Sequence, residues 1–228
     1  MKSKKTIIII ATLVVVVTAA AALLASALVR DFDAEKYVSV VLNQTFKGDV
    51  KGATEIIEGA TEEELMKQYE DGVTSFVKNN IINGVEVDAE REAQFIELGK
   101  KIFASMKYEV TGVEKISNEE YVVKVNYEAS DVFLKYIQYI AEESGRITAK
   151  VEDGEYKGTV DEINAQMEAD FINSAYTLLE QANTEMTYSE VQETEFVVKA
   201  GAEDLYQVNE TELHNLMVKI MRLDEIQD

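Results

Sequence analysis

The stretch KYEVTGVEKISNEEYVVKVNYEAS, residues 107–130, decides the fold class of this chain. Its apolar side chains alternate with polar ones on either side of a Ser-Asn-Glu-Glu turn, which predicts an antiparallel β-hairpin. An isolated hairpin is marginal in water, so we expect it to pair with two later predicted strands, residues 193–200 and 206–208. The result is a small antiparallel sheet of about four strands. The alternating apolar residues are Tyr108, Val110, Tyr121, Val123, Val125 and Tyr127.

Four helices are predicted ahead of the hairpin, from apolar residues spaced three and four apart. Asp33 is a typical cap for the first helix, and Gly48 supplies its stop. The third has the clearest start, because Thr61 and Glu64 form a capping box. The four predicted ranges are 33–48, 49–58, 61–80 and 88–106.

Further helices follow the hairpin. One opens at Asp131, the longest periodic stretch covers residues 163–182, and a last helix covers residues 213–223. Residues 147–151 fit either a continued helix or a strand with an Asp-Gly turn, and we favour the helix. Helices lead and antiparallel strands follow twice, so the pattern predicts an α+β class and one helix-rich domain.

The N-terminal segment indicates where this domain lies. Three lysines within residues 1–5 precede an uncharged run, residues 6–29, that ends at Arg30. At about 1.5 Å per residue, a helix of that length crosses the roughly 30 Å hydrocarbon core of a bilayer. Lysine and arginine mark the cytoplasmic side. We therefore expect residues 1–5 in the cytoplasm, a transmembrane helix over residues 6–29, and an extracytoplasmic domain over residues 31–228.

The same segment also has the three parts of a cleavable signal peptide, namely a basic start, an apolar stretch and the small triplet Ala25-Ser26-Ala27. Its apolar run is longer than the about 7 to 15 residues typical of a signal-peptide core, so we favour a retained single-pass anchor in the cell membrane. Cleavage after Ala27 would instead give a secreted protein. Both interpretations place the domain outside the cytoplasm.

The predicted extracytoplasmic domain is strongly acidic. Residues 1–30 hold four of the 22 basic residues and none of the 43 acidic ones, so residues 31–228 carry 18 basic and 43 acidic residues, a formal charge of −25. Such a field repels phosphates and anionic headgroups, which excludes nucleic acid and the membrane surface as partners. Basic partners and cations remain compatible with it. The plainer explanation of the charge is solubility.

The chain contains no cysteine and no proline, and 46% of its residues are hydrophobic. Without disulfides its stability must come from a core, which a domain of this length can form. The absence of proline excludes a Pro-rich stalk. A retained anchor would therefore hold the domain close to the membrane.

No residue after the apolar run stands out as catalytic. His214 is the only histidine, so a zinc site would need carboxylates alone, and its apolar neighbours indicate a helix-flank residue. With 43 carboxylates some acid pair will have the spacing of a glycosidase site by chance, so pairs such as Asp131 with Glu142 and Glu143 do not indicate an active site. We therefore predict no catalytic residues, and the protein is not expected to be an enzyme.

Metal, cofactor and glycan signals are also weak. Neither Asp31 with Asp33 nor residues 153–155 matches a calcium loop, and the single glycines form no P-loop or GxGxxG motif. We predict no metal-binding residues, no cofactor-binding residues and no cofactor. Asn43 and Asn209 begin glycosylation sequons, but helix capping explains Asn209 equally well.

Four parts of the chain carry a resemblance to a known family: DAEKYVSVVLNQTFKGDVKGATEII (33–57), TEEELMKQYEDG (61–72), KYEVTGVEKISNEEYVVKVNYEASDVF (107–133), and ETEFVVKAG with LYQVNETELHNLM (193–217). In pattern and order they resemble a family of uncharacterised exported proteins of Gram-positive bacteria, mostly lipoproteins, that carry a domain of unknown function. Members usually have a lipobox cysteine, which this chain lacks, so the apolar run is its only evident tether. The resemblance implies no known activity. The first two helices also look like the start of nuclear-transport-factor-like cone domains.

Together these observations predict a membrane-anchored extracytoplasmic protein of unknown function that binds or scaffolds rather than catalyses. Its expected partners are the membrane, through residues 6–29, and an unidentified protein or cell-envelope ligand. One alternative is a cell-envelope hydrolase that uses a carboxylate pair. Another is a small-ligand pocket in a cone-shaped sheet, lined by tyrosines. Packing in the core and the sheet is the simpler explanation of these tyrosines. These tyrosines are Tyr121, Tyr127, Tyr136, Tyr139 and Tyr206.

Overall fold

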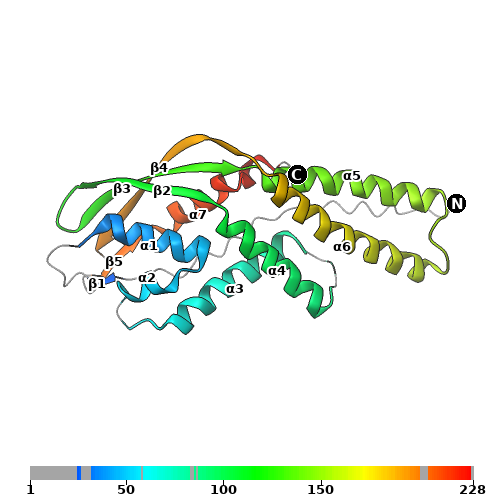
Figure 1. Cartoon of the computed structure of the whole chain (residues 1–228), viewed down its shortest axis with the longest axis horizontal. Helices are drawn as coiled ribbons and strands as arrows, with labels where there is room; N and C mark the ends of the chain where they lie inside the picture. Colours follow the sequence, from blue (N-terminus) through cyan, green and yellow to red (C-terminus); the bar gives the residue numbers. More distant parts are fainter. Residues whose placement is uncertain are drawn as a thin grey trace.

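The computed structural model describes residues 25–26, 32–57, 59–82, 85, 87–200 and 205–226 (Figure 1). Its described part has the predicted α+β class, with seven α-helices and an antiparallel sheet. The elements are β1 (Ala25–Ser26), α1 (Ala34–Lys47), α2 (Val50–Thr54), α3 (Glu62–Asn80), α4 (Ala89–Ala104), β2 (Lys107–Lys115), β3 (Glu120–Ser130), α5 (Val132–Glu152), α6 (Val160–Glu185), β4 (Tyr188–Ala200), β5 (Leu205–Val208), α7 (Glu210–Ile220) and a short 3₁₀ helix, η2 (Leu223–Glu225).

The sheet confirms the predicted hairpin and its pairing with the later strands. Its strand order is β1-β5-β4-β3-β2, and every neighbouring pair is antiparallel. Tyr127 of β3 lies opposite Tyr108 of β2 and Gln192 of β4. The predicted strand at 193–200 is too short, because β4 starts at Tyr188. Its first residues are polar and mostly exposed, so they lack the alternation that reveals a half-buried strand.

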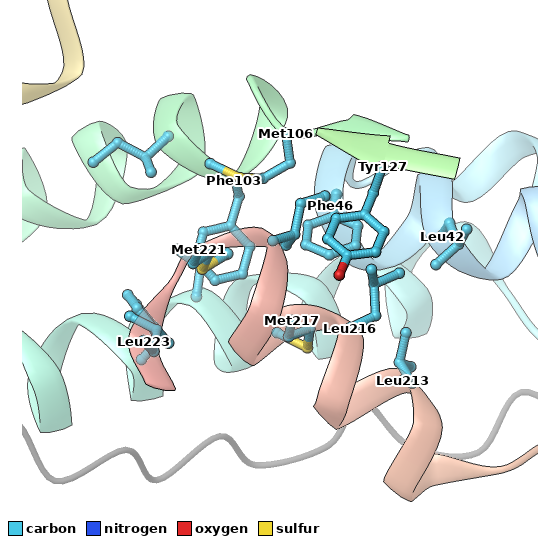
Figure 2. Packing of buried hydrophobic residues seen from close by; sticks show 14 of the residues in the cluster. Leu42, Phe46, Phe103, Met106, Tyr127, Leu213, Leu216, Met217, Met221 and Leu223 are labelled. Carbon is cyan, nitrogen blue, oxygen red and sulfur yellow. The ribbon is translucent and has the colours of Figure 1, made fainter. Parts of the chain in front are cut away.

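Most helices cover one face of the sheet and leave the other to solvent (Figure 1). The inner face carries buried apolar side chains, among them Val125 and Phe196. Figure 2 shows how Phe46 of α1, Phe103 of α4 and Met217 of α7 converge beneath it. The outer face carries ion pairs: Lys107 with Glu128 at 3.0 Å, Lys124 with Glu193 at 3.1 Å, and Lys199 with Glu120 at 3.2 Å.

The predicted helix starts are confirmed by their caps. The Asp33 carboxylate accepts a hydrogen bond from the Lys36 amide at 2.9 Å, and the Thr61–Glu64 capping box is complete. Gly48 ends α1 in the left-handed conformation, with φ 63°. A Cβ at Gly48 would lie 2.7 Å from the Tyr69 ring, so both backbone and packing require glycine there.

Other predicted boundaries are wrong as well. The last helix is expected over residues 213–223, but α7 covers Glu210–Ile220. The second helix is expected over residues 49–58, but α2 covers only Val50–Thr54, because turns follow from Glu55. The fourth is expected to reach Met106 but ends at Ala104, after which the chain enters β2. By contrast, residues 147–151 continue α5 to Glu152, as favoured.

Helices α5 and α6 form a two-helix arm that extends from the body of the domain (Figure 1). Phe171, Ala175 and Leu179, from the middle of α6 toward its C-terminal end, are buried. Ile163 and Met167 have the same helical spacing but are only partly buried, because they lie in the half of α6 that extends beyond the body. The periodicity of α6 therefore predicts its helix correctly but overstates its burial.

The predicted membrane segment falls almost entirely outside the described residues. Of residues 1–29 only Ala25 and Ser26 are described. The prediction of a helix over residues 6–29 is wrong for these two, because they form β1 and pair with β5 at the edge of the sheet. Within the part of the chain that the structure describes, no helix combines the length and the apolar character needed to cross a bilayer.

Candidate functional site

A groove runs between the solvent-facing side of α1 and the strand β2, and we call it the α1–β2 groove. It consists of two adjoining hollows of about 620 and 650 Å³ that share Lys47, Tyr108 and Glu109. Both are open to solvent. The first is lined by Asp33, Glu35, Lys36, Ser39, Asn43, Lys47, Tyr108, Glu109 and Val110. The second continues over the start of β2 to Asn126, Glu128 and Val191.

One stripe of α1 forms the helical wall. Lys36, Ser39, Asn43 and Lys47 follow each other at spacings of three and four, so they lie on one side of the helix. All four are exposed or partly exposed. Because the other sides of α1 are buried in the core, this stripe is held in a fixed position beside the sheet.

Tyr108 joins the two walls of the groove. Its hydroxyl donates to Asn43 Oδ1 at 3.0 Å and approaches the Leu42 carbonyl oxygen at 3.3 Å, and its ring packs against Phe46. Burial raises the pKa of the Tyr108 hydroxyl above its usual range, and the Asp49 carboxylate adds to this effect. Tyr108 is therefore a neutral phenol at neutral pH, and its hydrogen bonds fix β2 to α1.

Both signs of charge occur at each end of the groove: Lys36, which pairs with Glu55 at 3.2 Å, lies beside the carboxylates, and Glu109 and Glu128 lie beside the lysines. Asp33 and Glu35 stand at the start of α1. Lys47 stands at the end of α1, with its Nζ 4.8 Å from the centre of the Tyr108 ring, and Lys107 begins β2. Lys107 also pairs with Glu128 at 3.0 Å on the outer face.

Strand β2 is the last strand of the sheet, and the described residues place no strand on its far side. An edge strand has unpaired backbone N–H and C=O groups along its free side. The pairing of β2 with β3 shifts between Val110 and Gly112, which is a bulge at Thr111. The regular part of the free edge beside the groove is thus Lys107–Val110.

The carboxylates considered as an acid pair bind different partners. Burial disfavours the charge of Asp131, but hydrogen bonds from Lys135 and Thr187 outweigh it and lower the pKa of Asp131. The Arg146 guanidinium, helped by a hydrogen bond from Ser174, lowers the pKa of Glu143 against the effect of burial. Both groups serve structural contacts within the arm or at its base.

Neither Glu142 nor His214 lies in a cluster of chemically reactive side chains among the described residues. The exposed Glu142 accepts a hydrogen bond from Gln138 at 3.3 Å. His214 is half-buried on α7 beside the buried residues Leu213 and Met217. Among the described residues, no three His, Cys, Asp or Glu side chains gather as a metal site would require.

The residues weighed for calcium and for glycans have local roles in the structure. Asp33 caps α1, residues 153–155 form part of the turn between α5 and α6, and Asp31 lies outside the described residues. Asn43 accepts the hydrogen bond from Tyr108. Asn209 caps α7 by accepting from the Thr211 amide.

Four of the five tyrosines considered for a pocket are buried in the core: Tyr121, Tyr127, Tyr136 and Tyr206. Phe32 stacks on Tyr206 with ring centres 3.7 Å apart and also packs against Tyr121. Tyr139 lies on the arm, where its hydroxyl donates to Glu185. These five tyrosines thus serve packing and local hydrogen bonds, which agrees with the prediction that they pack in the core and the sheet.

Comparisons with known proteins add little. No protein-family model matches the chain, and no curated protein matches it. Among solved structures, "a putative lipoprotein (ycdA)" from Bacillus subtilis aligns with 16% identity and a TM-score of 0.46, over 81% of this chain and 54% of that one. The chain thus spans about half the length of that protein. A likeness this loose carries no argument about function.

Proposed function

We propose that this protein is an extracytoplasmic binding module without catalytic activity, anchored by the apolar run ahead of β1, and that its binding site is the α1–β2 groove. The observation that carries the proposal is the groove itself: an open channel with polar and charged walls, beside a strand edge that pairs with no other strand among the described residues. Unpaired strand edges are common peptide-docking sites.

The arrangement of carboxylates favours binding over hydrolysis. Carboxylate-dependent glycosidases need two facing carboxyl groups, one of them with a raised pKa. Among the described acidic residues with a resolved shift, Glu212 alone has a raised pKa, because burial outweighs the hydrogen bond from the Val197 amide. Glu212 thus serves β4 by binding its backbone, a structural task.

The packing of the sheet favours an external site over an internal one. A cone-shaped pocket would need inward tyrosines around an open volume. Instead, Tyr121 and Tyr206 pack edge-on against each other, with ring centres 5.8 Å apart, and Phe32 covers both. Tyr127 donates to Gln192 at 2.9 Å. The groove outside the core therefore offers the better place for a ligand.

The proposed location depends on the sequence. The basic residues 1–5 and the apolar run 6–29 have the order and charge bias of a single-pass anchor with a cytoplasmic N-terminus. The domain charge of −25 makes binding to anionic polymers unfavourable. We therefore expect a ligand that is neutral or basic overall.

Thermal unfolding of the full chain in detergent micelles tests this function. The panel holds extended peptides, cell-wall sugars and calcium, and a ligand at about 100 times its dissociation constant stabilises a fold by roughly 2.7 kcal/mol. We expect a rise in Tm with peptides and none with sugars. Turnover of cell-wall polymer that is lost in a carboxylate variant would contradict the proposal.

A further inference from the structure

We infer that the α1–β2 groove takes an extended peptide of about six residues, which joins the sheet as a new strand antiparallel to β2. A basic residue at the peptide's N-terminal end lies by Asp33 and Glu35, and an acidic residue at its C-terminal end lies by Lys47. This inference rests on the proposed function and specifies its ligand.

The backbone of β2 supplies the main contact. Alternate residues of an edge strand direct their N–H and C=O groups away from the sheet, where a new strand can bind them. The segment Lys107–Val110 is regular and borders the groove, whereas the bulge at Thr111 interrupts the ladder. The added strand therefore pairs over these residues and leaves the sheet at the bulge.

The length of α1 sets the length of the ligand. Its 14 residues span about 21 Å, which equals about six residues of extended chain. Side chains that point toward α1 meet the stripe of Ser39 and Asn43, both partly exposed and small or polar. We therefore expect small or β-branched residues in the middle of the peptide.

The charges set the direction of the peptide. Tyr108 near the start of β2 contacts Asn43 late in α1, whereas Phe32, just before α1, packs on Tyr121, which pairs with Lys115 at the end of β2. Helix α1 and strand β2 thus run in opposite directions. A strand antiparallel to β2 runs from Asp33 toward Lys47. Lys36 and Lys107 already pair with Glu55 and Glu128, so the N-terminal end of the peptide meets the carboxylates of Asp33 and Glu35, and its C-terminal end meets the ammonium group of Lys47.

A second copy of the chain is the competing occupant, because two β2 edges can also pair antiparallel. We favour a peptide because the hollow beside α1 has room for one extended strand, at about 620 Å³, and a second copy would bring its own α1 to the same place. Dimerisation with rising protein concentration, detected by sedimentation, that blocks peptide binding would overturn the inference.

Fluorescence anisotropy with the full chain in detergent micelles tests strand addition. The probe is the fluorescein-labelled peptide Arg-Thr-Val-Thr-Val-Glu. Two further peptides have the same sequence with backbone N-methyl groups on alternate residues. One peptide is methylated at the odd positions and the other at the even positions. We expect one methylated peptide to bind more than about tenfold more weakly than the parent, since it lacks the N–H groups that face β2. The other should bind nearly as the parent does. Equal binding by both methylated peptides would overturn strand addition and leave the binding function standing.

A charge swap tests direction. The variant Glu35→Lys with Lys47→Glu should prefer Glu-Thr-Val-Thr-Val-Arg over the parent peptide, by roughly fivefold at low salt, whereas the natural chain has the opposite preference. The matched control Glu210→Lys with Lys219→Glu reverses charges near the two ends of α7 and should leave the preference unchanged. An unchanged preference in the α1 variant would overturn the direction.

Absence of binding by every peptide up to about 1 mM, an affinity of roughly −4 kcal/mol, would overturn the whole inference. The proposed function would then depend on the thermal panel. A rise in Tm with another ligand would keep the binding module and discard the peptide.

Discussion

Apolar packing dominates in the body of the domain, whereas the far half of the α5–α6 arm combines a buried Ile147 with ion pairs and hydrogen bonds between its helices. In the body, Phe46, Phe103 and Phe133 are almost completely buried among apolar neighbours. In the arm, Lys150 and Tyr156 both bind Asp170, at 2.8 and 2.9 Å, and Val160 is 74% exposed. Burial of apolar surface stabilises strongly, whereas partly exposed ion pairs contribute little net free energy.

This difference explains how the protein can present a fixed groove on a firm body. Tyr108 and α1 belong to the body, so the walls of the groove are held by the apolar core. The directional contacts of the arm instead fix how α5 lies against α6. We therefore expect the arm to open locally while the groove remains intact.

The largest effect should come from truncating the core. Phe46→Ala removes a ring that is fully buried and packs against Phe103 and Tyr108, so we expect a loss of about 3 to 5 kcal/mol in the free energy of unfolding. Val160→Ala at the exposed start of α6 should change it by less than about 0.5 kcal/mol. Urea unfolding followed by circular dichroism measures both. Equal losses of unfolding free energy in the two variants would contradict the difference between the body and the arm.

The base of the arm should respond to acid. Asp131 accepts hydrogen bonds from Lys135 Nζ at 2.8 Å and from the Thr187 amide at 2.7 Å. Its folded-state pKa is lowered from the ordinary 3.8, so its contribution is fully present above that value and is lost as the pH falls through the lowered pKa. Asp131→Asn should cost about 1.5 to 3 kcal/mol at pH 7.

The difference between Asp131→Asn and the natural chain should shrink below pH 4, because the natural carboxyl then becomes protonated as well. Hydrogen exchange of the first turns of α5 across this range measures the effect. A cost that stays constant from pH 7 to pH 3 would contradict the role of the charge.

The smallest effect is expected within the arm. Glu143→Gln weakens the contacts with Arg146 and Ser174, at a cost of about 1 kcal/mol, and its neighbour Glu142→Gln on the exposed side should cost less than about 0.5 kcal/mol. Hydrogen exchange should rise in the arm and stay constant in β3. A rise throughout the body would show that arm and body unfold as one unit.

Local signals in the sequence predict most elements of the fold. The capping box at Thr61 and the glycine stop at Gly48 depend on neighbouring residues alone, and both are present in the structure. The alternation in residues 107–130 likewise reveals the hairpin. Patterns of this kind can be recognised in the sequence because each depends on a few residues close together in the chain.

The groove could not be predicted in the same way. It exists because β3 pairs with β4 on one side and leaves β2 at the edge, a choice made by contacts about 70 residues apart in the chain. Its stripe of Lys36, Ser39, Asn43 and Lys47 looks like any solvated helix side. The only available signal was that regular spacing, which has no meaning until β2 is known to lie beside it.

The central claim is that a ligand binds between α1 and the free edge of β2. Amide chemical shifts of the isotope-labelled full chain, titrated with Arg-Thr-Val-Thr-Val-Glu, test it most directly. The account predicts that the largest changes follow Lys107–Val110 and the Ser39–Lys47 side of α1, and that amides in the outer half of the arm stay unchanged. Changes centred on α5 and α6, with β2 unaffected, would contradict it.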